Sequence, residues 1–183
     1  MGLVVLIKGV NVGGHRTFRP TILARELKQY GAINVGAAGT FVIRGAVSRT
    51  RLRAAFRRHL PFDAEIMICD GRDILALAAE DPFAGQPSGS GIIRFVSVLA
   101  KRRVLPSAAP FVLPATGRWV VKVLARHGRF VLGVHRREMR AISHLGQLER
   151  ALGGPMTTRN WNTMLTLARL LEAAKPRDRR LSR

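Results

Sequence analysis

The sequence predicts an α+β protein made of two ferredoxin-like halves, each a split β-α-β unit with an antiparallel sheet. Residues 1–83 alternate between strand and helix patterns in the order β-α-β-β-α-β. Residues 84–91, AGQPSGSG, have the Gly, Ser and Pro content of a linker. Residues 92–174 begin with strand patterns and end with helix patterns, which indicates a second α+β half. The basic tail, residues 175–183, has little to bury and is expected to fray.

The first half opens with a buried strand and an amphipathic helix. Leu3–Ile7 is a continuous apolar run, and the glycine-rich segment after it indicates a sharp turn. Pro20 suits the first position of a helix, which Gly31 is expected to end. The apolar face of this helix is formed by Ile22, Leu23 and Leu27.

Two short strands, two helices and a further strand complete this half. Ile33–Ala37 and Thr40–Arg44 are β-rich runs separated by a tight turn. Ser48 is expected to cap a helix that ends at Pro61, because Ser favours the N-cap and Pro cannot continue a helix. The remaining elements are a strand at Glu65–Cys69 and a short helix at Asp73–Ala79, with Asp70 as its cap.

The second half starts with a strand at Ile92–Leu99. A connection that contains several prolines follows at residues 102–117. Two strands, Arg118–Ala125 and Arg129–His135, are expected to form a hairpin with its two-residue turn at His127–Gly128. Helices are predicted at Ser143–Leu152 and Arg159–Ala174. The sequence has no solenoid repeat and leaves open a loose duplication of one α+β unit.

The overall composition limits the class of protein. Hydrophobic residues make up 47% of the 183 residues, which excludes the disordered class despite a net charge of +20. The single cysteine, Cys69, excludes an internal disulfide and a multi-thiolate metal site. The N-terminal apolar run is too short for a signal peptide, and no segment has the roughly 20 apolar residues of a membrane helix. We therefore expect a cytoplasmic protein with no membrane partner, metal or cofactor.

Positive charge is concentrated in the second half. Residues before Gly91 include 12 basic and 7 acidic side chains, and those after it include 19 basic and 4 acidic side chains. In the expected hairpin, strand alternation gives one apolar face and one basic face. The apolar face would contain Trp119, Val121, Val123, Phe130, Leu132 and Val134, and the basic face Arg118, Lys122, Arg126, Arg129, His135 and Arg137.

The helix after Ser48 carries a second basic stripe. Arg49, Arg53 and Arg57 are spaced at i, i+4 and i+8 in a segment without an acidic residue. Like charges at this spacing cost roughly 0.2–0.5 kcal/mol per pair, a small penalty that solvent and salt can absorb. We predict a surface that binds nucleic acid or another polyanion, formed by these three arginines and by Arg118, Lys122, Arg126, Arg129 and Arg137. The alternative is a solvated surface that reflects arginine-rich codon usage.

Two polar segments support a different function, the binding of a small-molecule or phosphate ligand by a binder or an enzyme. The loop Gly9–Gly14 follows a strand, and successive backbone N–H groups in such a loop can hold an anion. The cluster Arg159–Asn162 surrounds a tryptophan with polar side chains. The predicted ligand residues are Lys8, Gly9, Asn11, Gly13, Gly14, Arg159, Asn160, Trp161 and Asn162. Each segment also has a structural explanation, a sharp strand exit for the loop and a capped, core-anchored helix for the cluster.

No catalytic constellation is recognised in the sequence. The five histidines lack the spacing of a metal site. Cys69 ends an apolar strand and is interpreted as a buried hydrophobic residue, and Asp70 and Asp73 as capping charges.

Three segments together resemble the bacterial family known as domain of unknown function 1697. These are VLIKGVNVGG near the N-terminus, EDPF in the middle and TTRNWNTMLTLA near the C-terminus. Lys8 and Val10 replace the Arg and Ile that are usual in the first motif, and Ala37–Thr40 replaces a Gln-Ser-Gly-Asn turn of relatives. The resemblance implies a two-part α+β architecture of ferredoxin-like halves and implies no known activity.

Overall fold

The computed structural model describes residues 2–10, 17–101 and 110–173, which form two antiparallel sheets and five α-helices. The first sheet contains β1 (Leu3–Ile7), β2 (Ala32–Asn34), β3 (Thr40–Ile43) and β4 (Ile66–Asp70). The second sheet contains β5 (Ile92–Leu99), β6 (Phe111–Leu113), β7 (Val121–His127), β8 (Phe130–Arg136) and β9 (Met156–Asn160). The helices are α1 (Pro20–Glu26), α2 (Arg49–His59), α3 (Gly71–Ala79), α4 (Arg140–Ala151) and α5 (Trp161–Glu172).

The two sheets have closely related topologies. The first has the order β2-β3-β1-β4, and the second has the order β6-β7-β8-β5-β9. Without the edge strand β6, the second order repeats the first, with β7, β8, β5 and β9 in the places of β2, β3, β1 and β4. In each half a helix follows the last strand, α3 after β4 and α5 after β9. The predicted α+β class with antiparallel sheets is confirmed.

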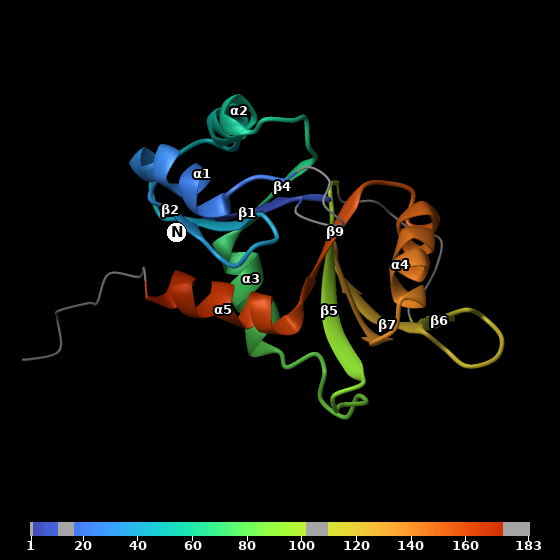
Figure 1. The fold of residues 1–183 in the computed structure, drawn as a ribbon. Helices are drawn as coiled ribbons and strands as arrows, with labels where there is room; N and C mark the ends of the chain where they lie inside the picture. Colours follow the sequence, from blue (N-terminus) through green and yellow to red (C-terminus); the bar gives the residue numbers. More distant parts are fainter. Residues whose placement is uncertain (1, 11–16, 102–109, 174–183) are drawn as a thin grey trace, which may run out of the picture.

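The helices and sheets alternate in layers (Figure 1). In β1, Val5 and Ile7 face the helices α1 and α2, whereas Val4 and Leu6 face the opposite side. That opposite side forms the central core with α3, α5 and the inner face of the second sheet. The outer face of the second sheet is covered by α4, through buried residues such as Leu148.

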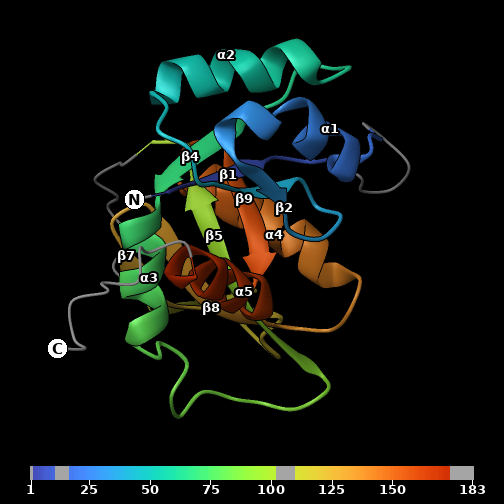
Figure 2. The same ribbon diagram turned by 90° about the vertical axis from the view of Figure 1, so that its left-hand side faces the viewer.

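The central core contains residues from both halves of the chain. The two trailing helices, α3 and α5, contact each other there, and Figure 2 shows both of them below the first sheet. Trp161 of α5 is buried and meets Phe83 edge to face, with the ring centroids 5.1 Å apart. The two halves therefore share one hydrophobic core. No helix in the described part of the chain is long and apolar enough to cross a membrane.

The hairpin β7–β8 differs from the prediction in its turn and its register. His127 pairs with Phe130, so the turn residues are Gly128 and Arg129 instead of His127 and Gly128. The register also shifts between Val123 and Ala125, which is a β-bulge. A displacement of one residue moves a side chain to the other face of a strand.

The predicted division of the hairpin into one apolar and one basic face is therefore wrong. Val121 and Val123 face α4, whereas Phe130, Leu132 and Val134 face the central core. Lys122 lies opposite Val134 and Arg126 lies opposite Val131, so these two basic residues are on different faces.

The last helix begins two residues later than predicted, because a strand precedes it. Residues Met156–Asn160 form β9, which pairs with β5 at the edge of the second sheet. Its β-branched residues Thr157 and Thr158 suit a strand. The helix starts at Trp161 because Asn160 caps it, and Asn160 Oδ1 accepts a hydrogen bond of 2.9 Å from the Thr163 backbone N–H.

Of the other two predicted caps, one is confirmed. Ser48 Oγ accepts a hydrogen bond of 3.2 Å from the Arg51 backbone N–H at the start of α2. Asp70 occupies the N-cap position of α3 but makes no side-chain capping bond. Its carboxylate pairs instead with the guanidinium of Arg49.

Candidate functional site

The arginine stripe of α2 lies along β4, an edge strand of the first sheet. Arg49 donates a hydrogen bond of 3.1 Å to the carbonyl of Ile68 and pairs with Asp70 at 2.5 Å. Arg53 donates to the carbonyl of Ile66. An edge strand has backbone groups without a partner strand, and these guanidinium groups bind two of its carbonyls.

Arg129, in the turn between β7 and β8, reaches the same strand from the second half of the chain. Its guanidinium donates to the carbonyls of Leu99 at 2.8 Å, Ala100 at 3.2 Å and Ile68 at 2.9 Å. The Ile68 carbonyl thus accepts hydrogen bonds from both Arg49 and Arg129. We call this group the basic edge, and it comprises Arg49, Arg53, Arg57 and Arg129.

The charges of the basic edge influence one another. The pKa of Arg53 is lowered, mainly because the side chain is partly buried and next because Arg57 is near. Arg129 and Arg49 lower it further, and Glu65 has the opposite effect. Two arginine-rich segments that are far apart in the sequence therefore form a single positive surface.

Of the remaining predicted polyanion residues, Arg126 contacts the turn that contains Arg129, and the others lie farther along the hairpin or beyond it. Arg118 pairs with Glu138 at 2.6 Å, and Arg137 follows the other end of β8. Arg126 Nε donates to the carbonyl of Gly128 at 2.9 Å. The half-buried Lys122 is the second residue of β7 and lies opposite Val134. Strand pairing thus disperses the hairpin residues that the prediction placed on one face.

Arg159 joins the two sheets through a buried guanidinium. Its Nε donates to Thr40 Oγ1 at 2.7 Å, and one terminal nitrogen donates to the carbonyls of Ile7 at 2.9 Å and Ala38 at 2.5 Å. The other terminal nitrogen donates to Thr157 Oγ1 and to the Thr158 carbonyl, both at 2.8 Å. All five N–H groups of a guanidinium are then used within the protein. Burial lowers the pKa of Arg159 to about 10.

The two segments predicted to bind a ligand meet at this arginine. Arg159 contacts the carbonyl of Ile7, directly before Lys8 and Gly9. Lys8 pairs with Glu149 of α4, and Gly9 has a left-handed φ of 62°. The other predicted loop residues, Asn11, Gly13 and Gly14, lie outside the described residues. Because Arg159 has no N–H group to spare, the contact between the segments holds the sheets together.

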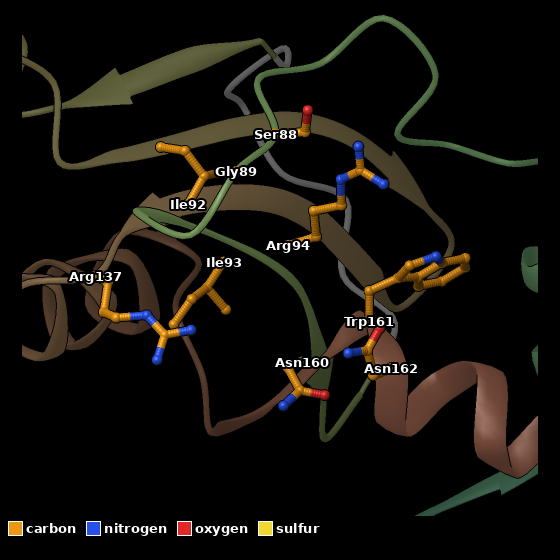
Figure 3. A pocket seen from close by; sticks show the side chains of 9 residues that line it. All are labelled: Ser88, Gly89, Ile92, Ile93, Arg94, Arg137, Asn160, Trp161 and Asn162. Atoms are coloured by element: carbon orange, nitrogen blue, oxygen red, sulfur yellow. The ribbon is translucent and has the colours of Figure 1, made fainter.

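The other residues of the C-terminal cluster line a cavity of about 360 Å³, which we call the linker pocket (Figure 3). The pocket lies where residues 84–91 enter β5 and where β9 meets α5. Asn160 and Asn162 have exposed side chains, whereas Trp161 is largely buried in the core. The lining residues are Ser88, Gly89, Ile92, Ile93, Arg94, Arg137, Asn160, Trp161 and Asn162.

The sequence reasoning missed Arg94 as a candidate site residue. It interrupts the apolar run of β5, IIRFVSVL, and its side chain is half-buried. Arg94 lies over the Phe83 ring, with its Cζ 5.8 Å from the ring centroid. A charged residue inside an otherwise apolar strand was the signal that could have identified it, because charged residues are rarely buried without a partner.

Metal and thiol chemistry receive no support from the described residues. Among them, no group of three or more His, Cys, Asp or Glu side chains is placed to hold a metal ion. Cys69 is buried in the central core, and desolvation raises the pKa of its thiol to about 11. The thiol is therefore protonated near neutral pH and is a weak nucleophile.

Comparisons with known proteins identify a family and a related fold. The family described as "Protein of unknown function (DUF1697)" matches residues 1–112. No curated protein matches the chain. Among solved structures, the chain is similar to the conserved bacterial protein SP0830 from Streptococcus pneumoniae, with 15% sequence identity and a TM-score of 0.54. That match covers 93% of this chain and 98% of the other.

Proposed function

Because the chain belongs to the protein family of unknown function DUF1697, its activity has to be inferred from its own surface, and we propose that it binds a polyanion through the basic edge. Nucleic acid is the partner that we propose. The observation that carries the proposal is the shared Ile68 carbonyl, which brings Arg49 of α2 and Arg129 of the hairpin turn together.

Arg57 of the basic edge and two neighbouring arginines of α2 extend this surface toward solvent. Arg51, Arg57 and Arg58 are exposed. Their guanidinium groups have no hydrogen bond or ion pair with any residue that the structure describes. Arg49, Arg53 and Arg129 fix the position of the surface by binding β4, while these three are available to a ligand. The positive charges of this cluster repel one another. Phosphates would neutralise these charges, so the cluster favours an anionic partner.

The proposed mode of binding is contact with the phosphate backbone. Aromatic residues are only 6% of the chain, and Phe56, the aromatic residue of α2, is buried. Apart from His59, this helix therefore exposes no aromatic ring on which bases could stack, as they do in single-strand readers. Binding should depend strongly on salt and weakly on base sequence. As part of the proposal we place this function in the cytoplasm, where nucleic acids are present.

Fluorescence anisotropy with a labelled 20-base-pair DNA duplex and a labelled RNA of equal length tests the proposal. With three to five phosphate contacts, log K should fall against log salt with a slope of about −3 to −5 for the duplex. The triple variant Arg51→Ala/Arg57→Ala/Arg58→Ala should weaken binding and make that slope shallower by about 0.9 for each lost contact.

The matched control removes the same charge elsewhere. Arg140, Arg150 and Arg169 are exposed on α4 and α5. The variant Arg140→Ala/Arg150→Ala/Arg169→Ala should retain most of the affinity. A lack of binding near physiological salt, a slope of zero, or an equal loss in both triple variants would contradict a site on the basic edge.

A further inference from the structure

We propose that the linker pocket is a docking site for an acidic segment of another protein, which adds to the edge of β5 as a short strand. β5 pairs with β8 from Ile92 onward, whereas its pairing with β9 begins only at Phe95. Residues 92–94 therefore have a partner strand on one side only, within the part of the chain that the structure describes. A strand edge of this kind is a template for pairing with another chain.

The ladder between β5 and β9 shows which backbone groups this edge offers. Just beyond the two strands, the Ala100 N–H donates to the Pro155 carbonyl at 2.9 Å. Hydrogen-bonded and non-hydrogen-bonded positions alternate along an antiparallel pair, so Ile92 and Arg94 also direct their backbone groups toward the β9 side. The Ile92 N–H already donates to the Gly89 carbonyl at 3.1 Å. The Ile92 carbonyl and the Arg94 N–H remain to pair with an added strand.

Two arginines flank this edge, one on each side of β5. Arg94 is half-buried, and no hydrogen bond or ion pair joins its guanidinium to any part of the chain that the structure describes. Arg137 is anchored by its Nε, which donates to the Ser90 carbonyl at 3.1 Å, and its two terminal nitrogens point away from that bond. Figure 3 shows the two guanidinium groups on opposite sides of β5 and pointing apart. The described lining of the pocket includes no acidic residue.

An extended peptide can reach both arginines, because successive side chains of a strand point to opposite faces. A peptide residue opposite Arg94 shares the face of that side chain. Its neighbour, opposite Ile93, shares the other face, on which Arg137 lies. Carboxylates form strong, charge-assisted hydrogen bonds with guanidinium groups. The occupant that fits the edge is therefore an extended segment with consecutive acidic residues.

The cavity has the position and the length for such a segment. It lies in line with β9, which ends at Asn160, and the start of α5 lines it through Trp161 and Asn162. Ser88 and Gly89 of the linker form another part of its lining. Three residues of β5 span about 10 Å at about 3.3 Å per residue, so the paired segment is about three residues long.

This site is separate from the basic edge and goes beyond the proposed binding of nucleic acid. Arg94 of the pocket and Leu99, whose carbonyl binds Arg129, lie toward opposite ends of β5. At about 3.3 Å per residue, the five-residue separation is about 16 Å. Peptide binding and nucleic-acid binding can therefore be measured independently.

Fluorescence anisotropy with the peptide TVEEEVT, labelled at its N-terminus and amidated at its C-terminus, tests the inference. Its Thr and Val residues favour an extended conformation, and its three consecutive glutamates present carboxylates to both faces. The neutral peptide TVQQQVT should bind about tenfold more weakly or worse, because it lacks the charge-assisted bonds. The acidic peptide with N-methyl groups on its three glutamates keeps the carboxylates but loses backbone donors, and it should also bind about tenfold more weakly.

Hydrogen exchange of single amides distinguishes strand addition from general attraction between charges. The Arg94 N–H should exchange more slowly when TVEEEVT is bound, because it then donates to a peptide carbonyl. The Ile93 N–H points to β8 by the same alternation and should keep its exchange rate. Unchanged exchange at Arg94 under saturating peptide would contradict the added strand.

Variants of the two arginines test the proposed contacts. Arg94→Met and Arg137→Met should each weaken TVEEEVT binding about tenfold, whereas Arg169→Met, on the exposed side of α5, should leave it unchanged. Arg94→Lys retains the charge and should fall between wild type and Arg94→Met. Circular dichroism identifies any variant that fails to fold, and the Lys variant then carries the test.

Three binding results would overturn the inference. These are no saturable binding of TVEEEVT up to about 1 mM, equal affinity for the acidic and the N-methylated peptide, and equal affinity in wild type and both Met variants. Loss of peptide binding in the triple variant of α2 would also overturn it, because the peptide would then occupy the basic edge. Arg94→Met should leave the salt dependence of DNA binding unchanged, so failure of one proposal is distinguishable from failure of the other.

Discussion

Arg159 has an unusual role for an arginine, because it is buried without a carboxylate partner among the residues that the structure describes. Only 7% of its surface is exposed, and its hydrogen bonds go to hydroxyl and carbonyl oxygens in both sheets. No neutral side chain offers five N–H donors to these oxygens. The depressed pKa shows that burial disfavours the charge, so the five hydrogen bonds have to offset this penalty.

Replacing Arg159 should therefore destabilise the whole protein. Arg159→Met keeps the apolar stem but leaves the oxygens of Ile7, Ala38 and Thr40 without these donors, and we expect a loss of roughly 2–4 kcal/mol in the free energy of unfolding. Urea denaturation measures the loss. The control Arg58→Met changes an exposed residue and should stay within about 0.5 kcal/mol. Equal stability of the two variants would contradict the role of Arg159 as a clamp between the sheets.

Cys69 gives a pH-dependent prediction at the same scale. Burial raises the pKa of its thiol from 9.0 to about 11, so the unfolded chain loses this proton before the folded chain does. The folded state then holds more protons between these pH values, and the contribution of this thiol to stability falls as pH rises from 9 toward 11. The difference in stability between wild type and Cys69→Ala, measured by urea denaturation from pH 7 to 11, should change in that direction. A constant difference would contradict it.

Among the elements, the hairpin β7–β8 has a position where packing leaves no room for a side chain. Gly133 of β8 faces the ring of Phe95, and a Cβ at this position would lie 2.4 Å from Phe95 Cζ and 2.5 Å from the Lys122 carbonyl oxygen. Both distances are far below van der Waals contact. The strand cannot move away, because β7 and β5 pair with it on both sides.

A methyl group at Gly133 should consequently disrupt the second sheet. We expect Gly133→Ala to lower the free energy of unfolding by at least roughly 1–3 kcal/mol. The matched change Gly146→Ala, in the middle of α4, meets only an Arg150 side-chain atom at 3.9 Å and should raise stability by roughly 0.5–1 kcal/mol. Thermal unfolding of both variants checks the opposite signs. A stability loss in Gly146→Ala equal to that in Gly133→Ala would remove the steric explanation.

The same hairpin shows why sequence patterns predicted elements better than faces. Apolar runs located β5 with its observed bounds and located β7 and β8 to within a few residues. The turn was misplaced by one residue, and the bulge near Leu124 has no local signal. Each shift moves side chains to the opposite face, so the basic surface could not be assigned from alternation alone. β9 was missed because its polar residues resemble a helix cap.

At the scale of the whole molecule, the positive charge has three different uses. Arg159 joins the two sheets from inside the molecule. A second group binds carbonyls of the edge strand β4 or of its neighbours, and it consists of Arg49, Arg53 and Arg129. Arg94 lies at the linker pocket. The net charge of +20 predicted a basic surface but could not separate these uses. That separation depends on contacts between the halves, and residues distant in sequence supply those contacts.

The shared central core leads to a prediction about the halves themselves. Both repeat one strand order, which suggests units that could fold alone. However, the inner face of the first sheet presents Val4, Leu6, Val42 and Met67 to a core that α5 and the second sheet complete. A fragment of residues 1–83 would expose this face to water, and burial of a large aliphatic side chain is worth about 1.5–3 kcal/mol.

We therefore expect the fragment of residues 1–83 to lack a cooperative thermal transition and to bind a hydrophobic dye such as ANS, while the full chain unfolds in one transition. Near-ultraviolet circular dichroism and calorimetry measure the two properties. A cooperative transition in the fragment would mean that α3 covers enough of the sheet without α5. In that case the duplication would consist of two independent units, and Arg159 would only connect them. A fragment without such a transition would instead show that each half needs the other to complete its core.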